Sequence, residues 1–135
     1  MSISNPKQEE FDRSMRNLCN ELDEYLENRF GSLYDLHPNR LKRGKAGNVS
    51  YDGLFSTGTK FTLGYGSPSG KGYLVDIEIV TLEKVSHQQR EIIEMCASDF
   101  LEEKLPLYFP SRELHVIREG RVYKIVGDFS LGTMH

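Results

Sequence analysis

Asp76, Glu78 and His115 are the side chains in this sequence best suited to acid–base chemistry. Asp76 and Glu78 are two residues apart in a predicted strand, so both carboxylates project from the same face of a sheet. Paired carboxylates can serve as acid and base where their surroundings drive their pKa values apart. Such a pair on an outer sheet face is more often a solvated stripe of charge, and we favour that interpretation. A small enzyme that uses these three residues is the second alternative for the function.

The glycine-rich segment 65–72 (YGSPSGKG) superficially matches a phosphate-binding loop. A loop of that kind has glycine where Tyr65 stands and serine or threonine where Gly72 stands, and it joins a strand to a helix. Here the segment joins two predicted strands, so no helix N-terminus would face a phosphate. We therefore predict the tip of a hairpin, with an anion-binding backbone nest as the alternative.

A basic cluster in a glycine-flanked loop is the best candidate for binding a ligand. The charged residues between positions 40 and 45 are all cations, namely Arg40, Lys42, Arg43 and Lys45. Such cations could neutralise the phosphates of RNA or of another polyanion. Only Tyr34 and Tyr51 lie nearby to stack on bases, and the whole chain has a net charge of −3. We expect a solvated loop, or one that rests on the acidic first helix, and keep polyanion or RNA binding as the alternative function.

No motif in the sequence indicates a metal, a cofactor or a covalent nucleophile. Cys19 and Cys96 stand alone in two predicted helices, where reduced thiols packed in the core are expected. The four histidines are far apart, no Gly-x-Ser-x-Gly element occurs, and no Gly-x-Gly-x-x-Gly follows a strand. We therefore predict no catalytic residue, no metal and no cofactor, and the motifs identify no protein family.

Length and composition indicate one globular domain of residues 1–135, with 38% hydrophobic and 27% charged residues. The first residues contain no apolar export segment, and no run approaches the roughly 20 apolar residues of a membrane span. We therefore expect a cytoplasmic protein that does not bind membranes.

The periodicity of apolar residues predicts two helices and two hairpins in the order α-β-β-α-β-β. This order indicates the α+β class, as a two-layer sandwich with a mostly antiparallel four-stranded sheet and both helices on one face. Heptad spacing in the first helix leaves an intermolecular coiled coil as the alternative to docking on this sheet. The predicted elements are a helix at about 6–29, a glycine-rich and basic loop at 31–58, a hairpin at 59–82, a helix at 86–104 and a hairpin at 113–127.

Two finer predictions concern the second half of the chain. The second helix is expected to place Ile92, Cys96 and Phe100 on the sheet, with Ile93, Ala97 and Leu101 widening this stripe, and to end near Lys104, before Pro106. The last hairpin is expected to turn at Glu119-Gly120. In that register the facing pairs are Arg118 with Arg121, Val116 with Tyr123 and Leu114 with Ile125.

The sheet face turned away from the helices is expected to be rich in aliphatic residues, which surround the charged centre of Asp76, Glu78, His115 and Lys124. A wholly solvated face rarely carries so many, so we expect the loop 31–58 or a second subunit to cover it. We therefore predict a non-catalytic interaction or assembly module that self-associates, with a homo-oligomer or another protein as its partner. The candidate interface residues are Leu74, Val80, Ile117, Val122 and Val126.

Overall fold

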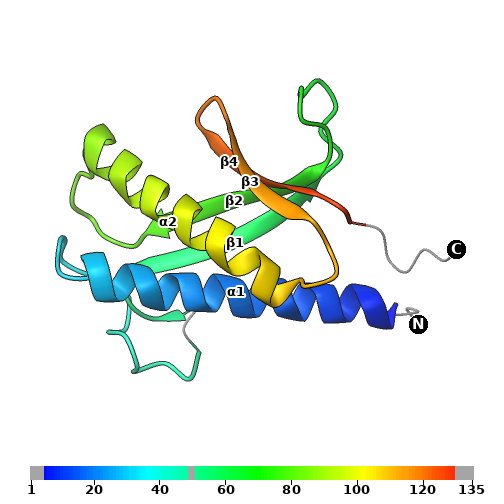
Figure 1. Ribbon diagram of the computed structural model, residues 1–135. Coiled ribbons are helices and arrows are strands. Elements are labelled where there is room, and N and C mark those ends of the chain that lie inside the picture. The colour runs from blue at the N-terminus through cyan, green and yellow to red at the C-terminus, as the bar shows by residue number, and fades with distance from the viewer. Residues whose placement is uncertain (1–4, 49–50, 130–135) are drawn as a thin grey trace, which may run out of the picture.

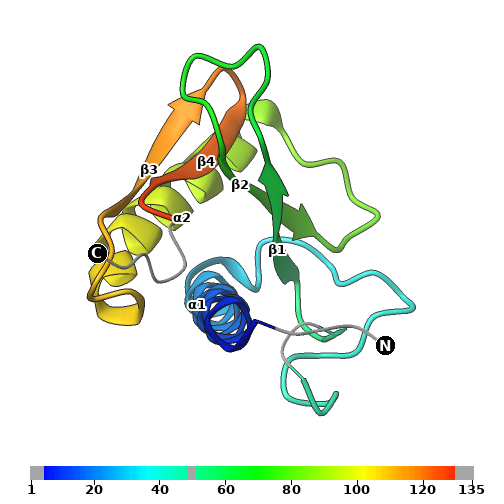
Figure 2. The ribbon, with the colours of Figure 1, turned by 90° about the vertical axis from the view of Figure 1, so that its right-hand side faces the viewer.

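The computed structural model describes residues 5–48 and 51–129, and the predicted order of elements is confirmed (Figure 1). The elements are α1 (Pro6–Phe30), β1 (Phe55–Thr62), β2 (Gly72–Ile79), α2 (His87–Tyr108), β3 (Leu114–Glu119) and β4 (Val122–Gly127). The strands form one antiparallel sheet in the order β1-β2-β4-β3. Figure 2, a view along α1, shows both helices beneath the curved sheet. The fold therefore has the predicted α+β class, with the helices packed on the sheet.

The start of α1 is determined by its N-terminal cap. The Asn5 side chain accepts hydrogen bonds from the backbone N–H groups of Lys7 and Gln8 at 2.9 and 3.3 Å, and Pro6 at the first position has no N–H to leave unsatisfied. The predicted stripe packs on α2 and the sheet of the same chain, so it is not free to form a coiled coil. Its fully packed members are Phe11, Met15, Leu18, Leu22 and Leu26.

α2 continues to Tyr108 and contains Pro106, so the predicted end near Lys104 was wrong. The proline stands in the last turn, where its missing N–H removes a single helical hydrogen bond. Leu105 and Phe109 are 1% and 5% exposed, and the Phe109 N–H donates to the Leu105 carbonyl at 2.8 Å. Burial of these two side chains therefore stabilises the last turn despite the proline.

The buried face of α2 is centred on Ile93, Ala97 and Leu101, the residues expected to widen the stripe, and not on its predicted centre. Ile92, expected on the sheet, is 49% exposed. Phe100 stacks on Tyr25 of α1 with ring centroids 4.7 Å apart, because α2 packs against α1 as well as against the sheet. The residues buried against the sheet are Ile93, Ala97, Leu101 and Leu105.

β1 begins four residues earlier than predicted and ends before Leu63. Phe55 and Thr57 are buried on the helix side of the sheet, which extends the strand into the predicted loop. Gly64 has a φ of +74°, a conformation that favours glycine and ends the extended run. Leu63 and Tyr65 therefore belong to the hairpin tip and not to the strand.

The β3–β4 hairpin turns at Gly120-Arg121, not at Glu119-Gly120, so its register differs by two residues from the prediction. Gly120 has a φ of +65° and Arg121 has no positive φ, which is the combination of a type II′ turn. Because the shift is an even number of residues, each side chain keeps its predicted face. The observed pairs include Glu119 with Val122, Arg118 with Tyr123 and Val116 with Ile125. In the part of the chain that the structure describes, no helix is both long and apolar enough to cross a membrane.

Candidate functional site

A buried lysine lies at the centre of the outer sheet face, which is the face turned away from the helices. Lys124 of β4 pairs with Leu74 of β2 and with Ile117 of β3, and only 1% of the residue is exposed. The tip of the β1–β2 hairpin folds over it. Nζ donates to three oxygens of this tip, the Ser67 and Ser69 hydroxyls and the Gly70 carbonyl, at 2.9, 2.7 and 2.7 Å.

Glu119, at the end of β3, binds the same two serines from the other side. Its carboxylate accepts from the Ser67 hydroxyl at 2.7 Å and from the Ser69 backbone N–H at 3.0 Å, and also from the Ser69 hydroxyl. Oε1 lies 3.6 Å from Nζ of Lys124. Hydrogen bonds from Ser69 and Ser67 lower the pKa of Glu119 to about 2. We call Lys124, Glu119, Ser67 and Ser69 the lysine cluster.

The lysine cluster holds the hairpin tip and is not arranged for nucleophilic catalysis. A serine nucleophile needs a neighbouring base that accepts its proton. Nζ of Lys124 instead donates to all three of its neighbours, and both serine hydroxyls donate to Glu119. The donors and acceptors are matched within the cluster, which is the pattern of a structural network.

Two glycines make room for this arrangement. A Cβ on Gly72 would lie 2.5 Å from the Ile125 carbonyl oxygen and 2.7 Å from Cδ of Lys124, so the lysine side chain crosses the strand where β2 has no side chain. A Cβ on Gly64 would overlap the Gly70 carbonyl, which closes the base of the tip. The two glycines and the lysine cluster therefore determine the conformation of the tip together.

The tip and the adjoining strand expose three large apolar side chains at alternate positions. Phe61 is 43%, Leu63 is 53% and Tyr65 is 90% exposed. We call these three residues the apolar patch. The green loop at the upper right of Figure 1 is the hairpin tip that carries Tyr65.

The structure does not bring Asp76, Glu78 and His115 together. The two carboxylates lie exposed on the outer face of β2. Nδ1 of His115 lies 2.9 Å from the Glu102 carboxylate of α2, and this hydrogen bond raises the pKa of His115. The histidine therefore belongs to a contact between β3 and α2, which is separate from the two carboxylates.

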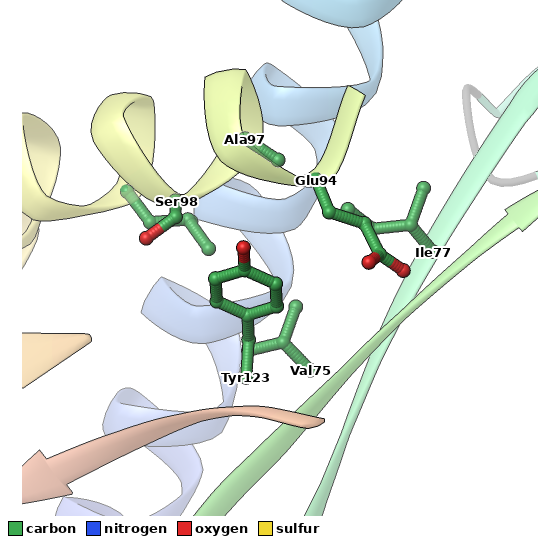
Figure 3. A pocket seen from close by; sticks show the side chains of 7 residues that line it. Val75, Ile77, Glu94, Ala97, Ser98 and Tyr123 are labelled. Atoms are coloured by element: carbon green, nitrogen blue, oxygen red, sulfur yellow. The ribbon is translucent and has the colours of Figure 1, made fainter. Parts of the chain in front are cut away.

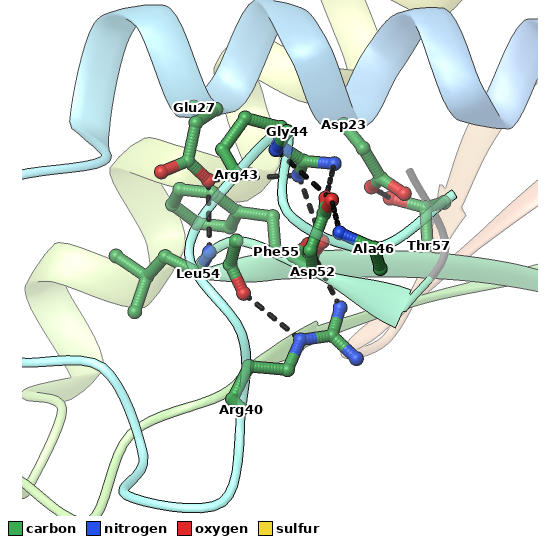
Figure 4. A network of polar contacts seen from close by, with 11 residues as sticks. Asp23, Glu27, Arg40, Arg43, Gly44, Ala46, Asp52, Leu54, Phe55 and Thr57 are labelled. Atoms are coloured by element: carbon green, nitrogen blue, oxygen red, sulfur yellow. Dashed lines mark hydrogen bonds and ion pairs between the residues drawn. The ribbon is translucent and has the colours of Figure 1, made fainter. Parts of the chain in front are cut away.

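Two of the four cations in the basic loop point inward (Figure 4). Arg43 donates to the buried carboxylate of Asp52 at 2.7 Å, and Arg40 donates to the carbonyls of Gly53 and Asp52, both at 3.0 Å. Lys42 and Lys45 are exposed. Polyanion binding through this loop stays a prediction, and the two arginines fold the loop in either case.

The hairpin tip covers the centre of the outer face, where the loop 31–58 or a second subunit was expected. Leu74 and Ile117 are half-buried beside Lys124. Val122 is 42% exposed, and Val126 and Val80 are half-buried. The loop instead packs beside α1, where the Leu54 N–H donates to the Glu27 carboxylate.

Two buried acids, Asp52 of the basic loop and Asp23 of α1, were not anticipated from the sequence. Asp23 of α1 is fully buried, and its Oδ1 accepts from the Thr57 hydroxyl at 2.7 Å, as Figure 4 shows. Its Oδ2 is buried and has no hydrogen-bond partner among the residues that the structure describes. Burial raises the pKa of Asp23 to about 6.

A crevice between α2 and the sheet is shown in Figure 3. It is lined by aliphatic side chains and by the polar groups of Glu94, Ser98 and Tyr123. Its volume of about 240 Å³ includes space open to solvent and is smaller than the roughly 300–1,000 Å³ of sites for small molecules. It does not identify a small-molecule site.

Sequence reasoning placed Lys124 on the outer face and residues 65–72 at a hairpin tip, but it did not join them. One available signal was a single lysine in the aliphatic run of β4 (VYKIV), where a solvated strand would carry more charge. A second was Ser-Pro-Ser enclosed by glycines. Neither pattern specifies a contact between segments more than 50 residues apart.

Comparisons with known proteins identify a family. Residues 6–127 match a family model described as "Uncharacterised protein". The chain is 46% identical over 129 residues to an uncharacterized protein of Borreliella burgdorferi, and the alignment covers 96% of this chain and 99% of that protein. No solved structure matches the chain. The chain therefore belongs to this family of uncharacterised proteins, and both the lysine cluster and the apolar patch lie within the matched residues.

Proposed function

We propose that this member of the family is a non-catalytic interaction module that binds a protein through the apolar patch. The observation that carries the proposal is Tyr65, which is 90% exposed on a hairpin tip held in place by a buried lysine. Single exposed apolar residues are common on protein surfaces. Three large ones at alternate positions, two of them aromatic, are typical of the anchors of protein interfaces.

The fixed conformation of the tip supports the same proposal. A flexible loop loses conformational entropy when it binds, and a loop already held in its bound shape avoids much of that cost. Ser67 and Ser69 are bound on both sides, by Lys124 and by Glu119. The lysine cluster thus presents the apolar patch in one conformation.

We also propose a cytoplasmic location. Cys19 and Cys96 are free thiols, which is usual for proteins of a reducing compartment.

Site-specific photo-cross-linking tests the proposed function. A benzophenone amino acid is placed at Tyr65 in one sample and at Leu107 in a control; Leu107 is 70% exposed on α2, away from the tip. The proposal predicts a discrete cross-linked product in cells for the probe at Tyr65 and none of comparable yield for the probe at Leu107. Equal yields at the two positions, or no product at Tyr65, would contradict it.

A binding measurement then follows with the cross-linked partner, once mass spectrometry has identified it. The double variant Leu63→Ser/Tyr65→Ser should weaken its binding at least about tenfold, as expected for the loss of central apolar anchors. The matched control Leu107→Ser should bind as the natural protein does.

A further inference from the structure

We propose that the partner of the apolar patch is a second copy of this chain, joined by antiparallel pairing of the two β1 strands. The inference rests on the proposed interaction function and names its partner. Three features support it: the backbone groups of Thr59 and Phe61 at the free edge of β1, the ability of residues 59–63 to pair with the same residues of a second copy, and the aromatic side chains beside them.

β1 is an edge strand, and contacts within the chain close its free side along the first half only. The Leu54 carbonyl accepts from the Val80 N–H at 2.7 Å, so the even-numbered residues of β1 bond to β2 and the odd-numbered ones face the free edge. On that edge the Thr57 carbonyl accepts from the Arg16 guanidinium at 2.7 Å. The edge is therefore occupied as far as Thr57.

The second half of the same edge is open. Among residues 5–48 and 51–129, none bonds to the outward backbone N–H and C=O groups of Thr59 and Phe61. An open edge of this kind is a template for another strand. Its continuation, Leu63, is 53% exposed, so both the backbone and the side chains of the segment are accessible.

A twofold axis through Phe61 pairs the open segment with itself. Thr59 of one copy then faces Leu63 of the other, and the two Phe61 residues face each other. All outward groups of Thr59 and Phe61 are thereby satisfied, as an isologous interface requires. A peptide from another protein could satisfy the same groups, whereas a second copy of this chain supplies them without any further component.

The charges in this register are compatible with pairing. Lys60 is the one charged residue of β1, and an edge lysine opposes pairing when it meets another cation. With the axis at Phe61, Lys60 lies opposite Thr62 of the second copy. An axis through Lys60 would place the two lysines directly opposite, which disfavours that register.

Aromatic side chains of the two copies would also meet at the twofold axis. Phe61 is the exposed end of a cluster in which its ring centroid lies 5.3 Å from Tyr73, and that of Tyr73 lies 5.4 Å from Phe11. In the dimer the second Phe61 ring covers the first, and aromatic pairs of this kind stabilise beyond the area that they bury. The 43% exposure of Phe61 would therefore fall on dimerisation.

Disulfide cross-linking of mixed variants tests the pairing and its register. Lys60 and Thr62 of the two copies form a non-hydrogen-bonded pair, with Cα atoms about 4.5 Å apart, a separation that a disulfide spans. A mixture of Lys60→Cys and Thr62→Cys proteins should yield a cross-linked product of twice the 15.5 kDa chain mass on mild oxidation. Each variant alone, and a mixture of Lys42→Cys with Lys71→Cys, should yield much less. Preferential self-cross-linking of Lys60→Cys would overturn the register.

Sedimentation equilibrium tests the dimer without oxidation. Thr59→Pro removes an outward N–H that does not bond to β2, so the circular dichroism spectrum should be unchanged while the dimer dissociation constant rises about tenfold or more. Thr59→Val keeps the N–H and should dimerise as the natural protein does.

The outcomes separate this inference from the proposed function. A chain that sediments as a monomer and gives no cross-link in the Lys60→Cys and Thr62→Cys mixture overturns the inference. If the Tyr65 probe then captures a different protein in cells, the interaction function stands and only the identity of the partner was wrong. If the Tyr65 probe captures nothing, both fail.

Discussion

Nζ of Lys124 lies 2.7 Å from Oγ of Ser69, although 55 residues separate them in the sequence. The contact joins the β1–β2 hairpin tip to the centre of the outer sheet face. Without it, the ammonium group of Lys124 would be a buried cation with no hydrogen-bond partner from the tip. Because a buried charge is stable only when its donors are satisfied, folding of the tip and burial of the lysine depend on each other.

Replacement of this lysine should destabilise the protein and free the tip. Lys124→Met keeps most of the side-chain volume but leaves the hydroxyls of Ser67 and Ser69 and the carboxylate of Glu119 without their cation. We expect a loss of about 2 kcal/mol in the free energy of unfolding, measured by urea denaturation. Hydrogen exchange at the Ser69 N–H should accelerate. The control Lys71→Met alters an exposed residue of the same tip and should change the free energy by less than about 0.5 kcal/mol; equal losses would contradict the role of Lys124.

Gly72 should tolerate no side chain, whereas Gly58 should. A Cβ at Gly72 meets the Ile125 carbonyl at 2.5 Å, while a Cβ at Gly58 meets nothing within 4 Å. We expect Gly72→Ala to cost about 2 kcal/mol or more in thermal or urea unfolding. Gly58→Ala, in the neighbouring strand of the same hairpin, should be neutral or slightly stabilising. Similar effects of the two variants would show that β2 and β4 do not approach each other so closely.

Asp23 should make stability depend on pH in the acidic range. Burial raises its pKa from 3.8 to about 6, so between about pH 4 and pH 6 the folded protein keeps a proton that the unfolded chain has released. The contribution of Asp23 to stability is therefore most favourable below pH 4 and decreases as the pH rises to 6, by on the order of 3 kcal/mol.

The variant Asp23→Asn isolates this contribution, because its amide does not titrate. The free energy of unfolding of the natural protein relative to Asp23→Asn should decrease from pH 4 to pH 7 in a series of urea titrations. A difference that stays constant over this range would contradict the raised pKa of Asp23.

Residues of the apolar patch should matter for binding and not for folding. Tyr65 and Leu63 are 90% and 53% exposed, so their replacement by serine should change the free energy of unfolding by less than about 0.5 kcal/mol. Leu101, buried between α2 and the sheet, is the contrasting case, since Leu101→Ala should cost about 2–5 kcal/mol. Global unfolding of the serine variants would show instead that the patch belongs to the core.

Local sequence patterns correctly predicted the features that depend on neighbouring residues, namely the start of α1 and the facing of residues in β3 and β4. Asn5 and the apolar spacing from Phe11 onward fixed α1, and alternation assigned each residue of β3 and β4 to the correct face. The position of the final turn was wrong because Glu119-Gly120 and Gly120-Arg121 are both short turn sequences, and the choice depends on which central residue takes a positive φ.

What could not be predicted depends on contacts between distant segments. Periodicity placed Ile93, Ala97 and Leu101 on the buried stripe of α2, but it does not encode the stacking of Phe100 on Tyr25 of α1. Similarly, no local signal joins Ser67 to Lys124. The aliphatic content of the outer sheet face was recognised from the sequence. The segment that covers this face, the hairpin tip at 65–72, was not, and its contact with Lys124 forms the lysine cluster.

Hydrogen exchange of the β1 edge amides tests pairing through this edge without any substitution, because it reports the outward N–H groups themselves. Exchange at the Thr59 and Phe61 N–H groups is compared over about a hundredfold range of protein concentration, since dimerisation follows mass action. Pairing of the two β1 strands predicts rapid exchange of these amides in dilute solution and strong protection at high concentration, while the amides of Gly58 and Lys60, bonded to β2, are protected throughout. Equal exchange of Thr59 and Phe61 at all concentrations would contradict pairing through this edge.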